Sequence, residues 1–163
     1  MKQLKVIGTR DESLSYEDRP TVKVVIRRGD EVLVLNKGLL PGGGVEPGET
    51  NVQAIERELR EELGVSVKNI QEIGEVVQYR DFIQKKYSIY GYAAEFGAFV
   101  SDPTPKDNGE AQFQLHWMTK EAAIAYVSGS IAMVESVVML GDAIQGRLYN
   151  LMTSLTLVKA MTK

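Results

Sequence analysis

The sequence predicts an α+β fold, an α/β/α sandwich in which a mixed β-sheet lies between helices. Three observations support this fold class. Apolar runs rich in β-branched residues recur along the chain, a segment of glycine and proline precedes an amphipathic helical pattern, and the C-terminal part returns to helical spacing. Strand, loop, helix, strand and helix in this order suit a sheet with helices packed on its faces.

Two strands are expected early, over residues 21–27 and 32–36, because both runs are rich in β-branched apolar residues. Gly29 lies in the short connection between them and supplies a hairpin turn. Residues 39–48 then hold four glycines and two prolines. Neither a helix nor a strand interior tolerates this composition, so a loop is expected here.

A helix is predicted over residues 51–63. Thr50 is placed as its N-cap, Gln53 completes a capping box, and Gly64 supplies a left-handed stop. At roughly 100° per residue, the apolar side chains share one stripe that we expect to be buried. Its members are Val52, Ile55, Leu59 and Leu63.

Further strands are expected over residues 71–79, 87–98 and 113–118, and the segment from Thr119 opens another helix. From Ser130 onward apolar residues recur at helical spacing, with Gly141 and Gly146 as expected interruptions. Residues 130–163 are therefore predicted to be a C-terminal helical extension. Its apolar stripe is expected either to cap the sheet or to form a homodimer interface.

The composition suits one domain spanning residues 1–163, because 163 residues with 44% hydrophobic content can bury a sufficient core. Cysteine is absent, which excludes disulfides and thiolate metal sites and is compatible with a reducing cytoplasm. We find neither a signal-peptide-like apolar run near Met1 nor an uncharged segment of transmembrane length. A cytoplasmic protein without a membrane partner is expected.

The formal net charge of -3 is unevenly distributed. Between Glu46 and Glu62 six acidic and two basic residues sum to -4, so the remainder of the chain sums to +1. Such an acidic patch repels phosphates unless a divalent cation lies between them. Long nucleic acid is therefore not expected to bind through general electrostatics.

Three carboxylates of the predicted helix, those of Glu58, Glu61 and Glu62, fall on an arc beside the apolar stripe. Like charges three and four residues apart destabilise an isolated helix by roughly 0.2–0.5 kcal/mol per pair. A solvated acidic face is the ordinary explanation of such a pattern. However, the glycine-rich loop directly before the helix lets backbone groups approach the same place, and carboxylate oxygens suit Mg²⁺ or Mn²⁺. We therefore predict a metal site.

The spacing of this region carries a family resemblance. Gly43 is followed after five residues by Glu49, and after seven more by Arg57-Glu58-Leu59, one residue, Glu61-Glu62, one residue, and Gly64-Val65. Every fixed position of the Nudix box is filled, so the chain resembles the Nudix (MutT-like) hydrolases. The resemblance covers about residues 22–127 and implies the Nudix fold, with Mg²⁺- or Mn²⁺-dependent cleavage of a nucleoside diphosphate linked to a further group.

The resemblance also implies residue roles. The metal ligands would be Glu58, Glu61 and Glu62, with the carbonyl of Gly42 as a further ligand. In this family Glu49 supports the geometry of loop and helix, as do the glycines Gly43 and Gly64. Arg57 lies one turn before Glu61, where its guanidinium can orient a ligand carboxylate or form a plain helical salt bridge.

The general base stays open among Glu58, Glu61 and Glu110, because Nudix enzymes differ in which glutamate accepts the proton of the attacking water. Glu110 lies in a polar loop, residues 103–111, ahead of Trp117. The family often has an acidic residue at this place. Glu110 is thus a candidate metal ligand or base, with an exposed loop acid as the alternative.

The substrate is the least determined feature. Arg27 and Arg80 are candidates for phosphate contacts, and Tyr79 and Tyr90 for stacking on a nucleobase, although surface charges and core aromatics are the ordinary alternatives. Signatures of ADP-ribose, diadenosine-polyphosphate and NADH hydrolases are not found. The expected partner is a small nucleotide. The competing hypothesis is a catalytically silent nucleotide-binding regulatory domain, although such domains often lose box glutamates that this chain keeps.

Overall fold

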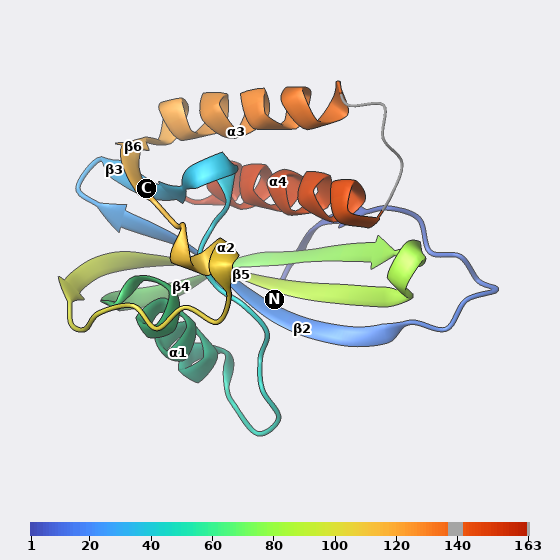
Figure 1. Ribbon diagram of the computed structural model, residues 1–163, viewed down its shortest axis with the longest axis horizontal. Helices are drawn as coiled ribbons and strands as arrows, with labels where there is room; N and C mark the ends of the chain where they lie inside the picture. The colour runs from blue at the N-terminus through green and yellow to red at the C-terminus, as the bar shows by residue number, and fades with distance from the viewer. Residues whose placement is uncertain (137–141, 163) are drawn as a thin grey trace.

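The computed structural model describes residues 1–136 and 142–162 as a mixed six-stranded sheet flanked by helices (Figure 1). The elements in chain order are β1 (Gln3–Ile7), β2 (Glu17–Arg28), β3 (Glu31–Leu35), the 3-10 turn η1 (Asn36–Gly38), α1 (Asn51–Leu63), β4 (Val65–Arg80), the 3-10 turn η2 (Asp81–Ile83), β5 (Lys85–Phe99), α2 (Asn108–Ala111), β6 (Leu115–Thr119), α3 (Lys120–Glu135) and α4 (Asp142–Ala160).

The strand order in the sheet is β1-β4-β5-β2-β3-β6. Strand β2 pairs parallel with β5 and β1 pairs parallel with β4, whereas β4 with β5, β2 with β3 and β3 with β6 are antiparallel. The central pair is long: its register runs from Glu17 opposite Lys85 to Arg27 opposite Glu95. This confirms the predicted mixed sheet and the α+β class.

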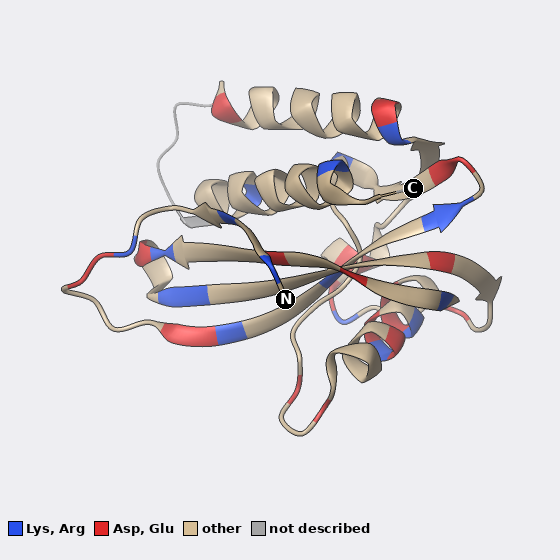
Figure 2. Cartoon of the chain, turned by 180° about the vertical axis from the view of Figure 1, so that it is seen from behind, with Lys and Arg blue, Asp and Glu red and all other residues tan. Residues whose placement is uncertain are grey.

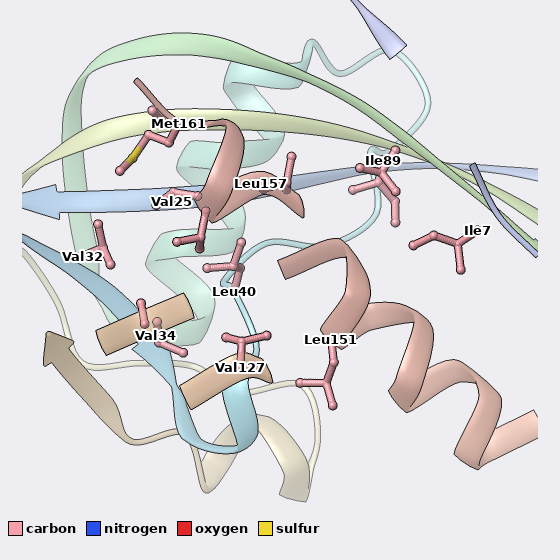
Figure 3. Packing of buried hydrophobic residues seen from close by; sticks show 14 of the residues in the cluster. Ile7, Val25, Val32, Val34, Leu40, Ile89, Val127, Leu151, Leu157 and Met161 are labelled. Atoms are coloured by element: carbon pink, nitrogen blue, oxygen red, sulfur yellow. The ribbon is translucent and has the colours of Figure 1, made fainter. Parts of the chain in front are cut away.

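The sheet separates two apolar cores, as an α/β/α sandwich requires. On one face α1 packs through Ile55 and Leu59 against β2 residues such as Val24. On the other face α3 and α4 cover the sheet (Figure 1). Figure 3 shows this second core, in which Leu151 and Leu157 of α4 pack with strand residues of the sheet. Side chains of β2 contribute to both cores, because successive side chains of a strand point to opposite faces of the sheet.

Helix α1 has the predicted boundaries and caps. The Thr50 side chain accepts from the Gln53 N–H, the Gln53 side chain accepts from the Thr50 N–H, and Gly64 has a φ of 67°. The predicted buried stripe is wrong at one position, because Val52 is 43% exposed. Val52 lies on the exposed side of the first turn of α1, and Ala54 is buried in that core instead.

The glycine-rich loop runs alongside β2 and is held there by its backbone. The Val22 N–H donates to the Gly43 carbonyl at 2.9 Å, and the Val24 N–H donates to the Pro41 carbonyl at 3.0 Å. Gly42 has a φ of 130°, and a Cβ there would lie 2.1 Å from the Val22 carbonyl oxygen. Only glycine allows the loop to lie this close to the strand.

Several predicted boundaries differ from the structure. Strand β1 was not expected, β2 begins at Glu17 rather than at residue 21, and β4 begins at Val65 rather than at residue 71. Residues 17–20 are polar or proline and exposed, so they lack the apolar alternation that identifies a strand. Strand β1 and residues 65–70 each contain three apolar residues, but both segments are short and only partly buried, so their apolar pattern is too brief to identify a strand. The later strands shift by one or two residues at their ends.

The C-terminal prediction also needs correction. Ser130 lies within α3 rather than at the start of an extension, and Gly146 lies inside α4 without interrupting it. A Cβ at Gly146 would lie 2.7 Å from Nη1 of Arg80, so α4 passes close to the end of that side chain. Gly141 lies outside the described residues. The apolar stripe of α4 packs against the sheet within the chain, which matches the capping alternative.

Candidate active site at helix α1

The three box carboxylates occupy different environments at the junction of α1 and the glycine-rich loop. Glu58 is 1% exposed and Glu62 is 6% exposed, whereas the side chain of Glu61 is 29% exposed. The loop lies directly on Glu58, since a Cβ at Gly43 would come within 2.5 Å of its carboxyl carbon. Because an unpaired buried carboxylate is costly, Glu58 needs cationic partners.

Arg57 is one such partner and also joins the helix to the loop. Its Nη1 lies 2.6 Å from Glu58 Oε1 and 3.5 Å from Glu61 Oε2. Its other nitrogens bind the Glu49 carboxylate at 2.8 and 2.9 Å and the Gly44 carbonyl at 2.8 Å. Hydrogen bonds with Glu49, followed by those with Glu58, raise the Arg57 pKa although burial opposes this. The guanidinium therefore contacts Glu49, Glu58 and the Gly44 carbonyl as well as Glu61, so its contacts exceed those of a plain helical salt bridge.

Lys106 is the second partner. It lies in the loop after β5, and its Nζ is 2.8 Å from Glu58 Oε1 and 3.0 Å from Glu61 Oε2. Burial lowers the pKa of Lys106, but the hydrogen bonds to the two carboxylates outweigh this and raise it. Its side chain is 47% exposed, so it bridges the two glutamates from the solvent side.

Glu62 and Lys23 form the inner part of the site. The Gly42 N–H donates to Glu62 Oε2 at 2.9 Å, and Lys23 Nζ donates to the carbonyl oxygens of Leu40 and Gly42 at 3.0 Å each. Burial raises the pKa of Glu62 to about 7, opposed by Lys23 and by the Gly42 N–H. Burial lowers the pKa of Lys23 despite the negative charges of Glu62, Glu58 and Glu110.

The donor set fits a divalent cation at Glu58 and Glu61. Glu58 Oε2 is buried and has no hydrogen-bond partner in the described part of the chain, so an acceptor is available. The Lys106 ammonium already bridges both carboxylates, which demonstrates that a cation can contact them together. Over residues 1–136 and 142–162, no three acidic or histidine side chains converge on one metal position. Glu62 points toward the loop backbone instead.

Glu110 lies close to this site without touching the helix glutamates. It belongs to the short helix α2, and its Oε2 accepts a hydrogen bond from the Lys106 N–H at 2.7 Å. The same lysine contacts Glu58 through its side chain.

A pocket of about 740 Å³ opens beside the glycine-rich loop. Its wall contains the loop residues Gly43 and Gly44 and basic side chains from three strands: Arg19, Lys23, Arg80 and Lys85. The Arg80 guanidinium lies 4.4 Å from the centroid of the Tyr87 ring. Its nitrogens donate to Gln78 Oε1 at 3.1 Å and to Asn150 Oδ1 at 3.0 Å. Helix α4 therefore contributes to this pocket through Asn150.

The other candidates for substrate contacts lie elsewhere. Arg27 lines a pocket with Lys120 and Met161, at the hairpin end of the sheet. Tyr79 packs edge-on against Tyr16, with ring centroids 5.2 Å apart, and Tyr90 packs in the α1 core. Of the four, only Arg80 lines the pocket beside the loop.

Sequence reasoning did not identify Lys23, Lys106 or Asn150. A lysine between the apolar residues of a central strand is the one signal that could have singled out Lys23. Lys106 and Asn150 come from segments remote in sequence, and nothing local distinguishes them.

Figure 2 shows acidic and basic residues interleaved along α1. Within the described residues, no helix is long and apolar enough to cross a membrane.

A family model described as NUDIX domain matches residues 17–135. The NAD-capped RNA hydrolase NudC of Haemophilus influenzae (strain PittEE) is 42% identical over 65 residues, which cover 34% of this chain and 25% of that protein. NudC of Pseudomonas aeruginosa (strain LESB58) is 44% identical over 62 residues, covering 34% and 22%. The chain thus spans about a quarter of the length of these curated relatives.

Solved structures show the same fold. A NUDIX hydrolase from Nitrosomonas europaea superposes with a TM-score of 0.57 at 21% identity, covering 84% of this chain and 90% of that chain. The MutT protein of Bacillus halodurans gives a TM-score of 0.53 at 22% identity, covering 76% and 84%. At these identities the similarity concerns the fold alone.

Proposed function

Since this chain belongs to the Nudix family, we propose that it is a pyrophosphohydrolase that cleaves the diphosphate linkage of a nucleoside diphosphate derivative or a nucleoside triphosphate. One observation carries the proposal. The carboxylates of Glu58 and Glu61 lie together at the glycine-rich loop, share a cationic partner, and adjoin a pocket that is lined by four basic and two acidic residues. This arrangement brings metal-binding groups next to a surface that attracts phosphates.

Mg²⁺ or Mn²⁺ would be held by Glu58 and Glu61, with Glu62 and Glu110 as nearby carboxylates that can join after side-chain rearrangement. When bound, the metal neutralises phosphate charge and lowers the pKa of water. Arg57 keeps the Glu58 carboxylate at the loop, so the acceptor oxygens are positioned before substrate arrives.

The pocket would bind the substrate. Arg80 is fixed by its stacking on Tyr87 and by Gln78 and Asn150, and Lys85 lies on the same wall. A planar guanidinium held in this way suits a phosphate oxygen pair. Tyr87 and the loop glycines offer apolar and backbone surface for the remainder of the nucleotide. The candidate contacts Arg27, Tyr79 and Tyr90 form no part of this pocket.

We assign proton acceptance from the attacking water to Glu61. Among the three box carboxylates it is the most exposed, whereas Glu58 is enclosed by the loop and Glu62 accepts from the Gly42 N–H. A base must reach solvent water within hydrogen-bond distance. Glu110 is the second candidate, because it lies in the short helix α2 and accepts a hydrogen bond from the N–H of Lys106, whose side chain contacts Glu58 and Glu61.

A substrate panel tests the proposal. The purified chain is incubated with Mg²⁺ or Mn²⁺ and with nucleoside triphosphates, ADP-ribose, diadenosine polyphosphate, NADH and an NAD-capped RNA oligonucleotide. The NAD-capped RNA is included because the curated relatives are named NAD-capped RNA hydrolase NudC. Products are separated by chromatography, with and without EDTA. We expect metal-dependent release of a nucleoside phosphate from at least one compound.

Variants on one helix make the test specific. Glu61→Gln and Glu62→Gln should reduce kcat by about 100-fold or more, since removal of a well-placed catalytic group has effects of this size. Glu56→Gln, an exposed residue of the same helix, serves as the matched control and should retain activity. If panel members bind but none is cleaved by the wild type, the chain is instead a regulatory nucleotide-binding domain.

We propose a single cytoplasmic domain. The absence of cysteine is compatible with that compartment. A homodimer stays a prediction, and since the apolar stripe of α4 packs within the chain, a dimer would use another surface. Size-exclusion chromatography with light scattering would measure the oligomeric state.

A further inference from the structure

Arg27 differs from the other partly buried arginines of the described residues, Arg57 and Arg80. Those two bind carboxylate, amide or carbonyl oxygens. The Nε of Arg27 is buried without a hydrogen-bond partner, and within residues 1–136 and 142–162 no carboxylate forms an ion pair with its guanidinium. Because a buried N–H without an acceptor is costly, this side chain is suited to receive an acceptor from a ligand.

The Arg27 side chain borders a pocket of about 370 Å³ at the hairpin end of the sheet. Arg28 and Lys68 also line this pocket, and Glu95 is the one acidic residue among the described residues of its wall. Three basic residues and one acidic residue give the wall a formal charge of +2. A phosphate group carries about -1.5 to -2 at pH 7, so it would balance this charge.

The carboxylate of Glu95 leaves the basic groups of this pocket available. In the sheet Glu95 lies between Lys68 of β4 and Arg27 of β2, as the partner of each in the strand register. Its Oε2 accepts a hydrogen bond from Asn69 Nδ2 at 3.0 Å, and it forms no ion pair with either base in the described part of the chain. The two cationic side chains therefore flank a carboxylate that is bound elsewhere.

Arg28 is held in place beside Arg27. Its guanidinium lies 4.1 Å from the centroid of the Trp117 ring, and its Nη2 lies 3.4 Å from Glu31 Oε1. A guanidinium that stacks on an aromatic ring loses little further freedom when it binds an anion. The pocket thus has one guanidinium already held by its neighbours and one without a partner.

Arg27 also borders a second pocket, of about 500 Å³, on the side of α3 and Met161. There the acidic residues Asp30, Glu31 and Glu121 outnumber Arg27 and Lys120. The Lys120 ammonium already donates to the Met161 carbonyl at 2.7 Å. An anion is therefore attracted to the Lys68 side of Arg27 rather than to this side.

The pocket at Lys68 is separate from the pocket beside the glycine-rich loop. Arg19 lines the latter and Arg27 the former, and both belong to β2. Eight residues of extended strand separate them, which is about 26 Å at roughly 3.3 Å per residue. A ligand at Arg27 would thus lie far from the carboxylates of α1.

We propose that this pocket is a second phosphate-binding site, in which Arg27, Arg28 and Lys68 bind the phosphate group of a small anionic ligand. Planar guanidinium groups suit pairs of phosphate oxygens, and lysine adds a point charge. Arg27 then has the phosphate-binding role that its residue type suggests, but away from the bond that is cleaved. The proposal goes beyond the proposed hydrolysis and does not depend on it, because no carboxylate of α1 takes part.

NMR of the arginine side chains tests the proposal at the site itself. The chain is labelled with [¹⁵N]arginine, and Arg27→Lys identifies the Nε–H signal of Arg27 while keeping the charge. The wild type is titrated in EDTA with sodium phosphate or with AMP, and sodium chloride keeps the ionic strength constant. We expect the Arg27 signal to shift and to saturate with both ligands. Tighter binding of AMP would identify a nucleotide phosphate as the ligand, and equal affinities free phosphate.

Two exposed lysines give matched variants for this titration. Lys68→Gln should weaken phosphate binding by about threefold or more, the effect of one partly solvated charge pair. Lys5→Gln removes the same charge from an exposed position on the edge strand β1 and should match the wild type. Both side chains are outside the cores, so the comparison does not require a change at Arg27. If Arg27→Lys does not fold, sequential assignment from the backbone identifies the same signal.

The results also separate this site from the proposed function. An Arg27 signal that stays unchanged with phosphate, or that shifts as much with chloride alone, overturns the proposal. Equal weakening in Lys5→Gln and Lys68→Gln overturns it as well, because the effect would then follow net charge. A wild type that binds phosphate at Arg27 but cleaves no substrate supports the site and contradicts only the proposed hydrolysis.

Discussion

Arg57 and Glu49 form a two-point ion pair in which Nε and Nη2 of the arginine lie 2.8 and 2.9 Å from the two carboxylate oxygens. Arg57 Nη2 also donates to the Gly44 carbonyl, and Nη1 lies 2.6 Å from Glu58 Oε1. The Arg57 side chain thus connects the loop carbonyl of Gly44, the Glu49 carboxylate and the buried Glu58 carboxylate.

This ion pair predicts a dependence of stability on pH. The hydrogen bonds from Arg57, and then the Glu46 N–H, lower the pKa of Glu49 from 4.5 to about 2. When folding lowers the pKa of a carboxyl group, the group stabilises the folded state at pH values above its pKa in the unfolded chain. This stabilisation is lost as the pH falls through its pKa in the folded state. Glu49→Gln should therefore lower the free energy of unfolding at pH 7, with the difference from wild type shrinking between pH 4.5 and 2.

Urea denaturation at a series of pH values measures this difference. Glu46→Gln is the matched control, because Glu46 lies 3.9 Å from Arg57 with a side chain that is 66% exposed. It should behave like the wild type at every pH. A Glu49→Gln deficit that stays constant through the acid range would show that the carboxylate charge is not the cause.

Two adjacent glycines offer a test of the loop that covers Glu58. A Cβ at Gly43 would lie 2.5–2.6 Å from the Glu58 carboxylate atoms, whereas a Cβ at Gly44 meets nothing within 4 Å. Gly43→Ala should displace the carboxylate and reduce kcat by about 100-fold, the loss expected for a misplacement near 1 Å. Gly44→Ala should retain activity. Steady-state kinetics with thermal melts of both variants measure this, and equal activities would refute the covering role of Gly43.

Helix α4 is predicted to act on substrate binding through Arg80. Asn150 Oδ1 accepts from Arg80 Nη2 at 3.0 Å and from Gln78 Nε2 at 3.4 Å. Asn150→Ala removes both hydrogen bonds, and loss of the one from Arg80 costs about 1 kcal/mol, so KM should rise roughly fivefold while kcat changes little. Asn150→Asp keeps the acceptor oxygen and should restore the wild-type KM. A fall in kcat with unchanged KM would argue against a positioning role.

Lys106 is predicted to compete with the metal for Glu58 and Glu61. A partly exposed ion pair is worth roughly 0.5–1 kcal/mol, which corresponds to about two- to fivefold in affinity. Lys106→Met should therefore tighten Mg²⁺ binding by about that factor in isothermal titration calorimetry. Lys5→Met is the control, because Lys5 is an exposed residue of the edge strand β1. This variant should not change the Mg²⁺ affinity. Weaker Mg²⁺ binding by Lys106→Met would contradict the competition.

Helix α1 could be predicted from the sequence because the interactions that begin and end it join residues close together in the chain. The Thr50 cap, the Gln53 side chain and the left-handed Gly64 each act within a few residues, and all three occur as expected. Strand β1 was missed since its stability comes from pairing with β4, more than 60 residues later in the chain. Val52 was wrongly expected to be buried because helical periodicity does not define where the core ends.

The α+β class, the capped helix and the spacing of Glu58, Glu61 and Glu62 follow from short-range geometry, so they could be predicted from the residues alone. The differences among the three carboxylates arise from contacts between distant segments. The loop at Gly43 buries Glu58, the Gly42 N–H engages Glu62, and Lys23 and Lys106 arrive from distant segments to meet them. Burial and ion pairing depend on which surfaces pack together, and periodicity along one helix carries no information about its partners.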